Sequence, residues 1–228
     1  MPAGQRLIDL VAVMDRLRSP GGCPWDREQT HRSLAPYLLE EAYETLEAID
    51  TGDRDHLREE LGDLLLQVVF HARVAAEHPD DPWTIDDVAA GITDKLVRRH
   101  PHVFADAVAE TPAHVEAAWE QLKAAEKSRT SALDGIPPAL PALALAAKTL
   151  SRAHRAGIAP PLPEPAQPPG AGDEEAVGDA LLALVAHAHD QGVDAEQALR
   201  SAVRRYADRV RHAESGADQP HPLPEEPA

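Results

Sequence analysis

Two short acidic clusters are the residues of this 228-residue sequence best suited to chemistry. The first, Glu40–Glu44, reads Glu-Glu-Ala-Tyr-Glu. The second, Glu60–Asp63, reads Glu-Leu-Gly-Asp and continues directly into the apolar segment 64–70. Burying a carboxylate among leucines is costly unless the group is paired or binds a metal ion. The clusters therefore predict a site for hard cations and, with them, phosphate chemistry.

Helical spacing can bring these carboxylates together. Residues three or four apart share one face of a helix, which pairs Glu41 with Glu44 and Glu60 with Asp63. A short connection around Gly52 predicts that the two helices are antiparallel neighbours, so that four or five carboxylates face one space. Ligation by oxygen alone suits Mg²⁺, or Mn²⁺, better than Zn²⁺.

Two other interpretations compete with a magnesium site. Carboxylates on an isolated helix usually lie on a solvated face, but the segment after Asp63 offers no polar residue except Gln67. A di-iron bundle needs Glu-x-x-His on two helices, and the sequence has a single match, Glu28–His31, near a turn. Gly62 lowers helix stability by about 1 kcal/mol relative to alanine, and we expect it to mark a close approach of another helix.

Basic and aromatic residues downstream could hold a polyphosphate and a base. Lys95 and Arg99 lie four apart in one expected helix, and Trp119 and Lys123 lie four apart in the next. Lysine and arginine neutralise phosphate oxygens, and tryptophan can stack on a base. Each of these residues taken alone is more commonly an ion-pair partner or a packing residue. Trp25 is a further stacking candidate, for which packing in the core is an equally good interpretation.

The composition limits the function classes. The formal net charge of −17 argues against nucleic acid or an anionic membrane as a partner, and no basic recognition helix supports a DNA-binding regulator. One cysteine, Cys23, excludes a disulfide framework within the chain and fits a reducing compartment. The first residues lack the apolar core of a secretory signal, and no apolar run reaches membrane-spanning length. We expect a soluble, cytoplasmic protein.

Apolar periodicity, capping residues, prolines and glycines divide the chain into helices. No segment shows the period-two alternation of a strand, so an all-α fold is predicted. The stretch 159–172 is too rich in proline for a helix and is expected to be a semi-rigid linker. The expected helices cover residues 4–18, 33–50, 55–77, 84–100, 111–128, 138–156, 174–190 and 194–214.

An internal repeat relates the two ends of the chain. The segment 59–66 has an echo at residues 175–182, with Ala176 at the position of Glu60. The proline-rich linker stands where a copy of the first acidic cluster would lie. We interpret residues 173–214 as a second, degenerate repeat without a metal site.

Together with the acidic clusters, several further motifs follow one another along the chain. They are Cys23-Pro24-Trp25-Asp26 with Gln29-Thr30-His31, Asp94-Lys95-Leu96 with Arg98–Phe104, Trp119–Lys123, and Leu133–Pro137 with Leu140–Leu143. In this combination the sequence, over residues 7–156, resembles the MazG nucleoside triphosphate pyrophosphohydrolases.

The resemblance implies a fold, an activity and a set of site residues. The fold is all-α with a four-helix core, usually in a homodimer, and the reaction is Mg²⁺-dependent hydrolysis of a nucleoside triphosphate to the monophosphate and pyrophosphate. Glu40 and Glu41 are the catalytic candidates, with Glu40 as an extra ligand or as the residue that orients the attacking water. The carboxylate that accepts the proton stays unassigned. The implied Mg²⁺ ligands are Glu41, Glu44, Glu60 and Asp63, and the implied substrate contacts are Lys95, Arg99, Trp119 and Lys123.

The domain prediction follows from the resemblance and the linker. It comprises a pyrophosphohydrolase domain (1–130), a connecting helix (131–158), the linker (159–172), the degenerate repeat (173–214) and a disordered tail (215–228). The preferred hypothesis is an enzyme of nucleotide-pool sanitation or control that acts through its first domain. The alternative is a catalytically weak nucleotide-binding or assembly module, in which the family's activity belonged to the degenerate second domain.

Overall fold

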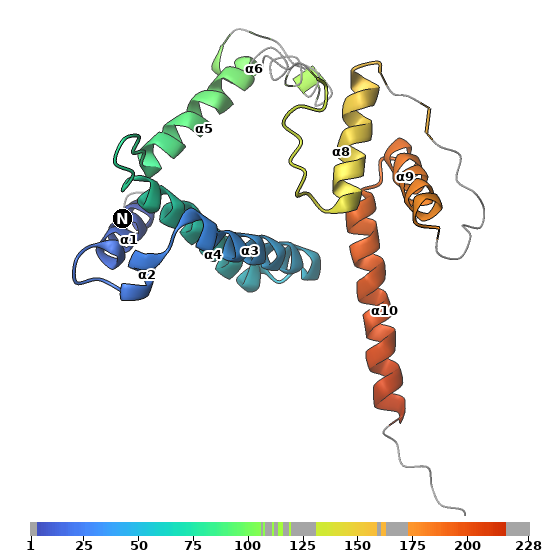
Figure 1. Ribbon diagram of the computed structural model, residues 1–228, viewed down its shortest axis with the longest axis horizontal. Coiled ribbons are helices and arrows are strands. Elements are labelled where there is room, and N and C mark those ends of the chain that lie inside the picture. Colours follow the sequence, from blue (N-terminus) through green and yellow to red (C-terminus); the bar gives the residue numbers. More distant parts are fainter. Residues whose placement is uncertain are drawn as a thin grey trace, which may run out of the picture. The chain divides into compact units, whose positions relative to one another are not determined.

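A computed structural model describes most of the chain, and its ordered elements are helices. The described residues are 4–105, 107, 111, 114, 115, 119, 131–158, 161, 162 and 173–217, with side chains up to residue 212. None of these residues lies in a strand, which confirms the all-α prediction. The helices are α1 (Gln5–Arg18), α2 (Pro24–Glu28), α3 (His31–Thr51), α4 (Arg54–Ala75), α5 (Ile85–Arg99), α6 (Pro101–Phe104), α8 (Ala142–Arg155), α9 (Glu174–Asp190) and α10 (Ala195–Ala217) (Figure 1).

The chain divides into two compact units, residues 1–125 and 126–228. Most of the predicted helix over 111–128 lies outside the described residues, as does most of the predicted linker. Within residues 215–228, α10 continues to Ala217, and the rest lies outside the described part. None of the helices in the described ranges is long and apolar enough to cross a membrane.

Two short helices were not predicted, and proline explains both. Pro24 opens α2 and Pro101 opens α6. A proline at the first helical position lacks only an N–H that would be unpaired there anyway, and its φ already suits a helix. The motif around Trp25 is therefore helical, although none of the expected helices included it.

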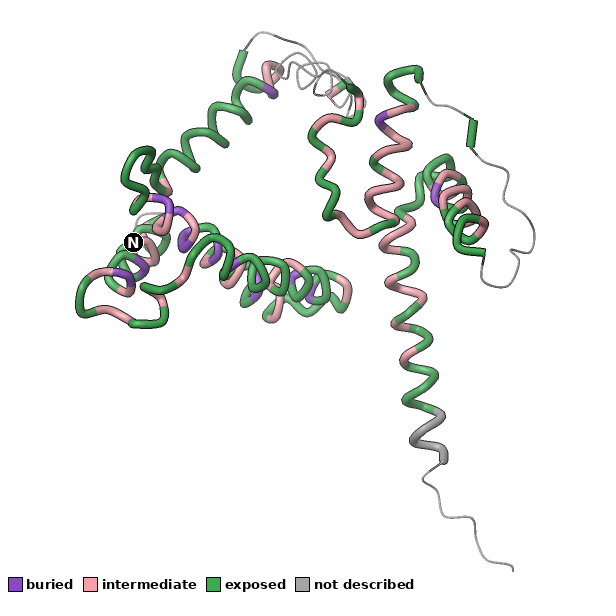
Figure 2. The backbone as a smooth tube through the Cα atoms, in the orientation of Figure 1, coloured by how far each residue is buried: buried purple, intermediate pink, exposed green. Residues whose placement is uncertain are grey.

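The core of the first unit forms where α1, α3 and α4 meet. Its buried side chains are Met14, Leu34, Val69 and Phe70. Figure 2 colours the buried parts of the backbone purple. Arg18, 6% exposed, closes one end of this core. Its guanidinium pairs with the Glu77 carboxylate at 2.7 Å and donates to the backbone carbonyls of Asp26 and Gln29.

The hairpin of α3 and α4 carries both acidic clusters, and its turn is set by two residues. Gly52 ends α3 in the left-handed region at φ 73°, which favours glycine. Asp53 then caps α4, because its side chain accepts from the backbone N–H groups of Asp55 and His56. At the other end, Thr30 and Ser33 form a capping box, so α3 begins at His31 rather than near residue 33.

Gly62 does not mark a close helix approach. A Cβ added to this glycine would meet no atom within 4 Å, and the residue is exposed. The prediction was wrong because Gly62 is exposed on α4 and no other helix comes close to it in the described structure.

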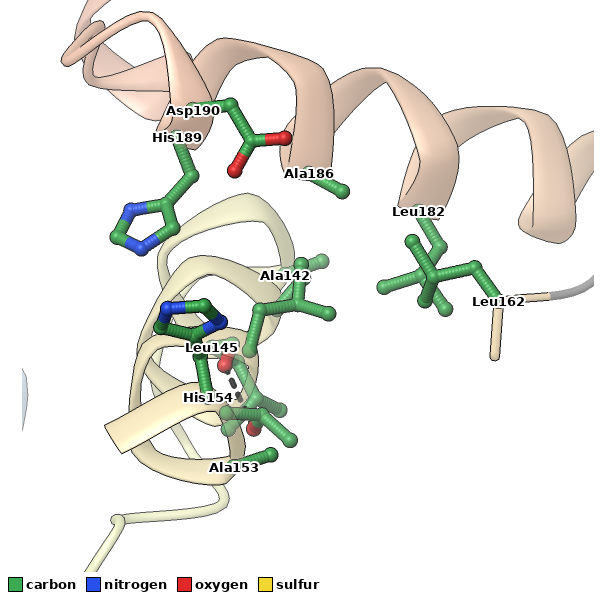
Figure 3. A pocket seen from close by; sticks show the side chains of 12 residues that line it. Ala142, Leu145, Ala153, His154, Leu162, Leu182, Ala186, His189 and Asp190 are labelled. Atoms are coloured by element: carbon green, nitrogen blue, oxygen red, sulfur yellow. Dashed lines mark hydrogen bonds between the residues drawn. The ribbon is translucent and has the colours of Figure 1, made fainter. Parts of the chain in front are cut away.

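The second unit contains α8, α9 and α10. Arg152 of α8 is buried and donates to the backbone carbonyl of Ala132 at 3.1 Å. A cavity of about 610 Å³ lies between α8 and α9, with apolar side chains over most of its lining. Figure 3 shows His154 and His189 at one end of this cavity and Leu162 and Leu182 at the other.

Candidate metal and phosphate site

Three carboxylates from the facing helices converge in the hairpin. Glu41 of α3 and Glu60 and Asp63 of α4 each offer an oxygen, and these three oxygens lie within 4.8 Å of one another. The contact joins the two sequence clusters across the hairpin, as the antiparallel arrangement requires. A group of this kind is the usual protein contribution to a magnesium or manganese site.

Glu60 is the most enclosed member of the group. The residue is 7% exposed, and its Oε1 lies 3.0 Å from His56 Nε2. Its Oε2 is buried and has no hydrogen-bond partner among the described residues. A buried carboxylate oxygen without a partner is costly, and a bound cation would supply the missing interaction. The donor set therefore fits a hard divalent cation.

The raised pKa of Glu41 also indicates a cation site in the hairpin. Burial raises the pKa of the Glu41 carboxyl, and the nearby charges of Asp63, Glu44, Glu60 and Glu40 raise it further. Each of these neighbours disfavours ionisation of Glu41, and a divalent cation would reverse this effect.

The remaining members of the first cluster lie at the edge of the group. Glu44 and Glu40 are exposed, and neither belongs to the set of three oxygens within 4.8 Å. Burial and then the charges of Glu60 and Glu40 raise the pKa of Glu44, while the nearby His56 acts in the opposite direction. Glu44 thus adjoins the site without contributing to its three-oxygen group.

The predicted phosphate-binding residues form a second group at the end of α5. Lys95 is exposed, whereas Arg99 is 6% exposed, with its guanidinium 5.8 Å from the centre of the Trp119 ring. His100 meets the same tryptophan edge-on, with 4.7 Å between ring centres. Figure 1 shows α5 diverging from the α3/α4 hairpin, so this group and the acidic group are separate in a single chain. Lys123 lies outside the described residues.

Trp25 lies on α2 and is half exposed. Its ring meets Tyr37 at 6.1 Å and Phe70 at 6.5 Å between ring centres, both edge-on. One part of the ring therefore packs on the core while the rest stays accessible, and stacking on a base stays a prediction.

Several polar side chains along the hairpin were not predicted from the sequence. The α4 residues His56, Gln67 and His71 follow the line of Glu60 and Asp63 at helical spacing. Gln67 Oε1 and His71 Nε2 are buried without a partner among the described residues. His71 Nδ1 lies 2.8 Å from His31 Nδ1 across the hairpin. The four-residue spacing of His56 and Glu60 was the feature of the sequence that could have placed His56 beside the acidic group.

Comparison with known proteins gives consistent matches. Residues 29–104 match the family model of the MazG nucleotide pyrophosphohydrolase domain, a range that contains both acidic clusters and α5. The chain is 42% identical over 228 residues to the Thermotoga maritima nucleoside triphosphate pyrophosphohydrolase/pyrophosphatase MazG, covering 93% of this chain and 87% of that protein.

Two further relatives extend the comparison. The Escherichia coli K12 nucleoside triphosphate pyrophosphohydrolase is 44% identical over 227 residues, covering 90% of this chain and 86% of that protein. An uncharacterized 26.1 kDa protein of Streptomyces cacaoi is 53% identical over 212 residues, covering 92% of this chain and 84% of its own length. The similarity therefore extends beyond the hairpin over most of the chain.

Proposed function

Because this chain belongs to the MazG family of nucleoside triphosphate pyrophosphohydrolases, we propose that its α3/α4 hairpin hydrolyses a nucleoside triphosphate to the monophosphate and pyrophosphate with Mg²⁺. The observation that carries this proposal is the group of Glu41, Glu60 and Asp63, with one buried oxygen of Glu60 unpartnered in the described structure. Mn²⁺ is the alternative cation, because it accepts the same oxygen ligands.

The roles of the acidic residues follow from their positions. Glu41, Glu60 and Asp63 would hold the cation, with Glu44 at the edge of the site as a fourth ligand. When bound, Mg²⁺ supplies Lewis acidity and charge neutralisation at the phosphates. Glu40, exposed and adjacent in sequence to Glu41, is suited to orient the attacking water. The carboxylate that accepts the proton stays unassigned, because a bound cation would reverse the rise of the Glu41 pKa.

The substrate's phosphates and base would be held by the group on α5. Lys95 and Arg99 are suited to bind the leaving pyrophosphate, since both provide donors and positive charge. Trp119 and Trp25 are the candidates for stacking on the base, and Lys123 is a further candidate for phosphate contact. One substrate molecule can contact both the acidic group of the hairpin and the basic group of α5 only if these two elements lie closer together than they do in one chain.

A homodimer is part of the proposal. The outer faces of the hairpin expose large apolar side chains, among them Leu39 (58%), Ile49 (55%) and Leu61 (50%). Large exposed apolar patches commonly mark interaction surfaces. A second copy that packs on these faces would bury them, and sedimentation analysis of the purified protein would detect a mass near twice 24.6 kDa.

The physiological role we propose is nucleotide-pool sanitation or control. We place it in the cytoplasm, because a chain with a single cysteine forms no internal disulfide and fits a reducing compartment. The alternative, a catalytically weak nucleotide-binding or assembly module, is not favoured. The named relatives are enzymes that match this chain over most of its length, and the acidic residues are present in the first unit.

Product analysis tests the proposal. The full-length protein is incubated with Mg²⁺ and a panel of canonical and modified nucleoside triphosphates, and pyrophosphate and orthophosphate are measured separately. We expect monophosphate and pyrophosphate in equal amounts. Release of orthophosphate with a diphosphate would contradict the proposed bond cleavage. Calorimetric binding of a non-hydrolysable triphosphate without turnover of any substrate would favour the assembly module instead.

A further inference from the structure

We infer that His56 is a positioning residue for the metal site, whose imidazole fixes the Glu60 carboxylate with one oxygen free to face Glu41 and Asp63. His56 Nε2 lies 3.0 Å from Glu60 Oε1. The inference rests on the proposed function, because it assigns a role relative to the cation of that same site. His56 does not itself belong to the three-oxygen group.

The hairpin turn holds His56 in place. Its backbone N–H donates to the capping Asp53 side chain at 3.1 Å, which fixes the first turn of α4 directly after Gly52. The His56 side chain is 38% exposed and reaches one helical turn forward to Glu60. The turn, the helix cap and the buried carboxylate are therefore joined in one continuous chain of contacts.

The contact with His56 decides which oxygen of Glu60 is available. A glutamate has three side-chain torsions and loses much rotamer freedom when it is ordered. With Oε1 3.0 Å from Nε2 of the imidazole, Oε2 is the oxygen without a protein partner in the described structure. Carboxylates that bind metals are commonly oriented by side chains outside the ligand set, and the loss of one such partner typically lowers metal affinity about 10- to 100-fold.

The same turn of α4 carries a matched control. Arg58 pairs with Asp55 at 3.1 Å, and both side chains are at least 80% exposed. This pair is an i,i+3 contact in the first turns of α4, whereas His56 and Glu60 are four apart; it lies in solvent and is worth little. Replacing Arg58 changes the charge beside the site without touching the Glu60 carboxylate.

Direct titration with Mn²⁺ tests the inference without nucleotide or turnover. Full-length wild type, His56→Ala, His56→Gln and Arg58→Ala are titrated with Mn²⁺, and free Mn²⁺ is followed by electron paramagnetic resonance. We expect His56→Ala to bind Mn²⁺ about 10- to 100-fold more weakly. His56→Gln retains an N–H donor and should recover part of the affinity, and Arg58→Ala should match the wild type.

Thermal unfolding of the metal-free variants separates positioning from general destabilisation. A merely structural role for His56 would lower the melting temperature of His56→Ala and leave the Mn²⁺ affinity of the folded protein unchanged. Unchanged or tighter Mn²⁺ binding by His56→Ala would overturn the inference and leave the proposed function standing. A wild type that binds no Mn²⁺ would overturn both the inference and the proposed metal site.

Discussion

Helices α4 and α9 carry similar sequence patterns, but the helix pairs to which they belong, α3/α4 and α8/α9, gather different chemistry. In α3/α4, carboxylates from both helices meet, and one of their oxygens is buried without a partner in the described structure. In α8/α9, the described side chains between the helices are mostly apolar and enclose a cavity of about 610 Å³ (Figure 3). Helix α8 contains no acidic residue at all.

The position of the helix start explains part of this difference. In α4 the capping Asp53 lies seven residues before Glu60, so Glu60 falls in the second turn. In α9 the capping Asp173 lies three residues before Ala176, whose N–H donates to that aspartate at 3.0 Å. Helix α9, which follows the proline-rich stretch, therefore begins about one turn later, relative to the repeated segment, than α4 does. A site needs a carboxylate at the right turn as well as a facing acidic helix.

The largest effect should come from exchanging one aspartate for its isostere in each region. Asp63→Asn removes a charge from the three-oxygen group, whereas Asp179→Asn changes the echoed position in α9. Stabilisation by a bound metal is worth several kcal/mol, so we expect Asp63→Asn to lower kcat/KM about 1,000-fold. Asp179→Asn should retain wild-type activity in the same pyrophosphate-release assay, and a comparable loss there would erase the contrast between the regions.

Each unit contains a buried arginine, and replacing the two arginines should lower the free energy of unfolding by different amounts. Arg18 pairs with Glu77 and also donates to backbone carbonyls, so Arg18→Met should lower the free energy of unfolding by about 3 kcal/mol. Arg152 donates to the carbonyls of Ala132 and Asp134, so Arg152→Met should cost about 1–2 kcal/mol.

Urea unfolding with two probes can separate these effects. All three tryptophans lie before residue 126, so their fluorescence reports the first unit, whereas far-ultraviolet circular dichroism reports both. Arg18→Met should shift the fluorescence transition to lower urea concentration. A larger shift of that transition for Arg152→Met would contradict the assignment of the two arginines to separate units.

The pH dependence of stability gives a smaller effect with a defined sign. The folded-state pKa of Glu41 is raised above its ordinary value of 4.5, so between these values the folded state binds more protons than the unfolded state. Without metal, the contribution of Glu41 should therefore make the wild type more stable as pH falls through this window. Glu41→Gln should lack that contribution.

The effect of Glu41 must be measured as a difference between the two proteins. Glu77 has a lowered pKa because of its bonds and ion pairs with Arg18 and Arg73, so its contribution is lost as the pH falls. This opposite slope is common to the wild type and to Glu41→Gln and cancels in the difference of their melting temperatures. A difference that grows in favour of the wild type as pH rises would contradict the expected sign.

The smallest effect should follow from restoring the missing glutamate. Ala176→Glu recreates the second acidic motif in sequence, but the residue lies in the first turn of α9, and the neighbouring helix α8 contains no acidic residue. We expect no additional Mn²⁺ site in an electron paramagnetic resonance titration and a stability change within about 0.5 kcal/mol. A second bound Mn²⁺ per chain would show that α9 retains a usable site.

The sequence predicted those features that depend on local chemistry. The all-α fold is confirmed, since the apolar periodicity and the residues around Thr30, Gly52 and Asp53 act within one or two turns. The unpredicted α2 depends on a proline that can either open a helix or form a turn. The wrong expectation for Gly62 shows that composition alone does not say which side of a helix meets a neighbour.

The geometry of the site depends more on tertiary structure. Helical spacing predicted that the two clusters would face each other, and the structure brings Glu41, Glu60 and Asp63 together. Helical spacing could not distinguish Glu44 from these three residues, because one helical step decides whether a side chain points into the hairpin or lies at its edge. The separation of α5 from the hairpin likewise follows from the path of the chain after α4, which local patterns do not define.

Pyrophosphate release by full-length Glu60→Ala, measured beside the wild type with Mg²⁺ and the best triphosphate of the panel, is the decisive test of the proposed active site. Glu60 provides the unpartnered buried oxygen, and circular dichroism can verify that its helices persist in the variant. We predict that turnover is abolished while helical content is unchanged. Mg²⁺-dependent pyrophosphate release at the wild-type rate by Glu60→Ala would place the active site outside this hairpin.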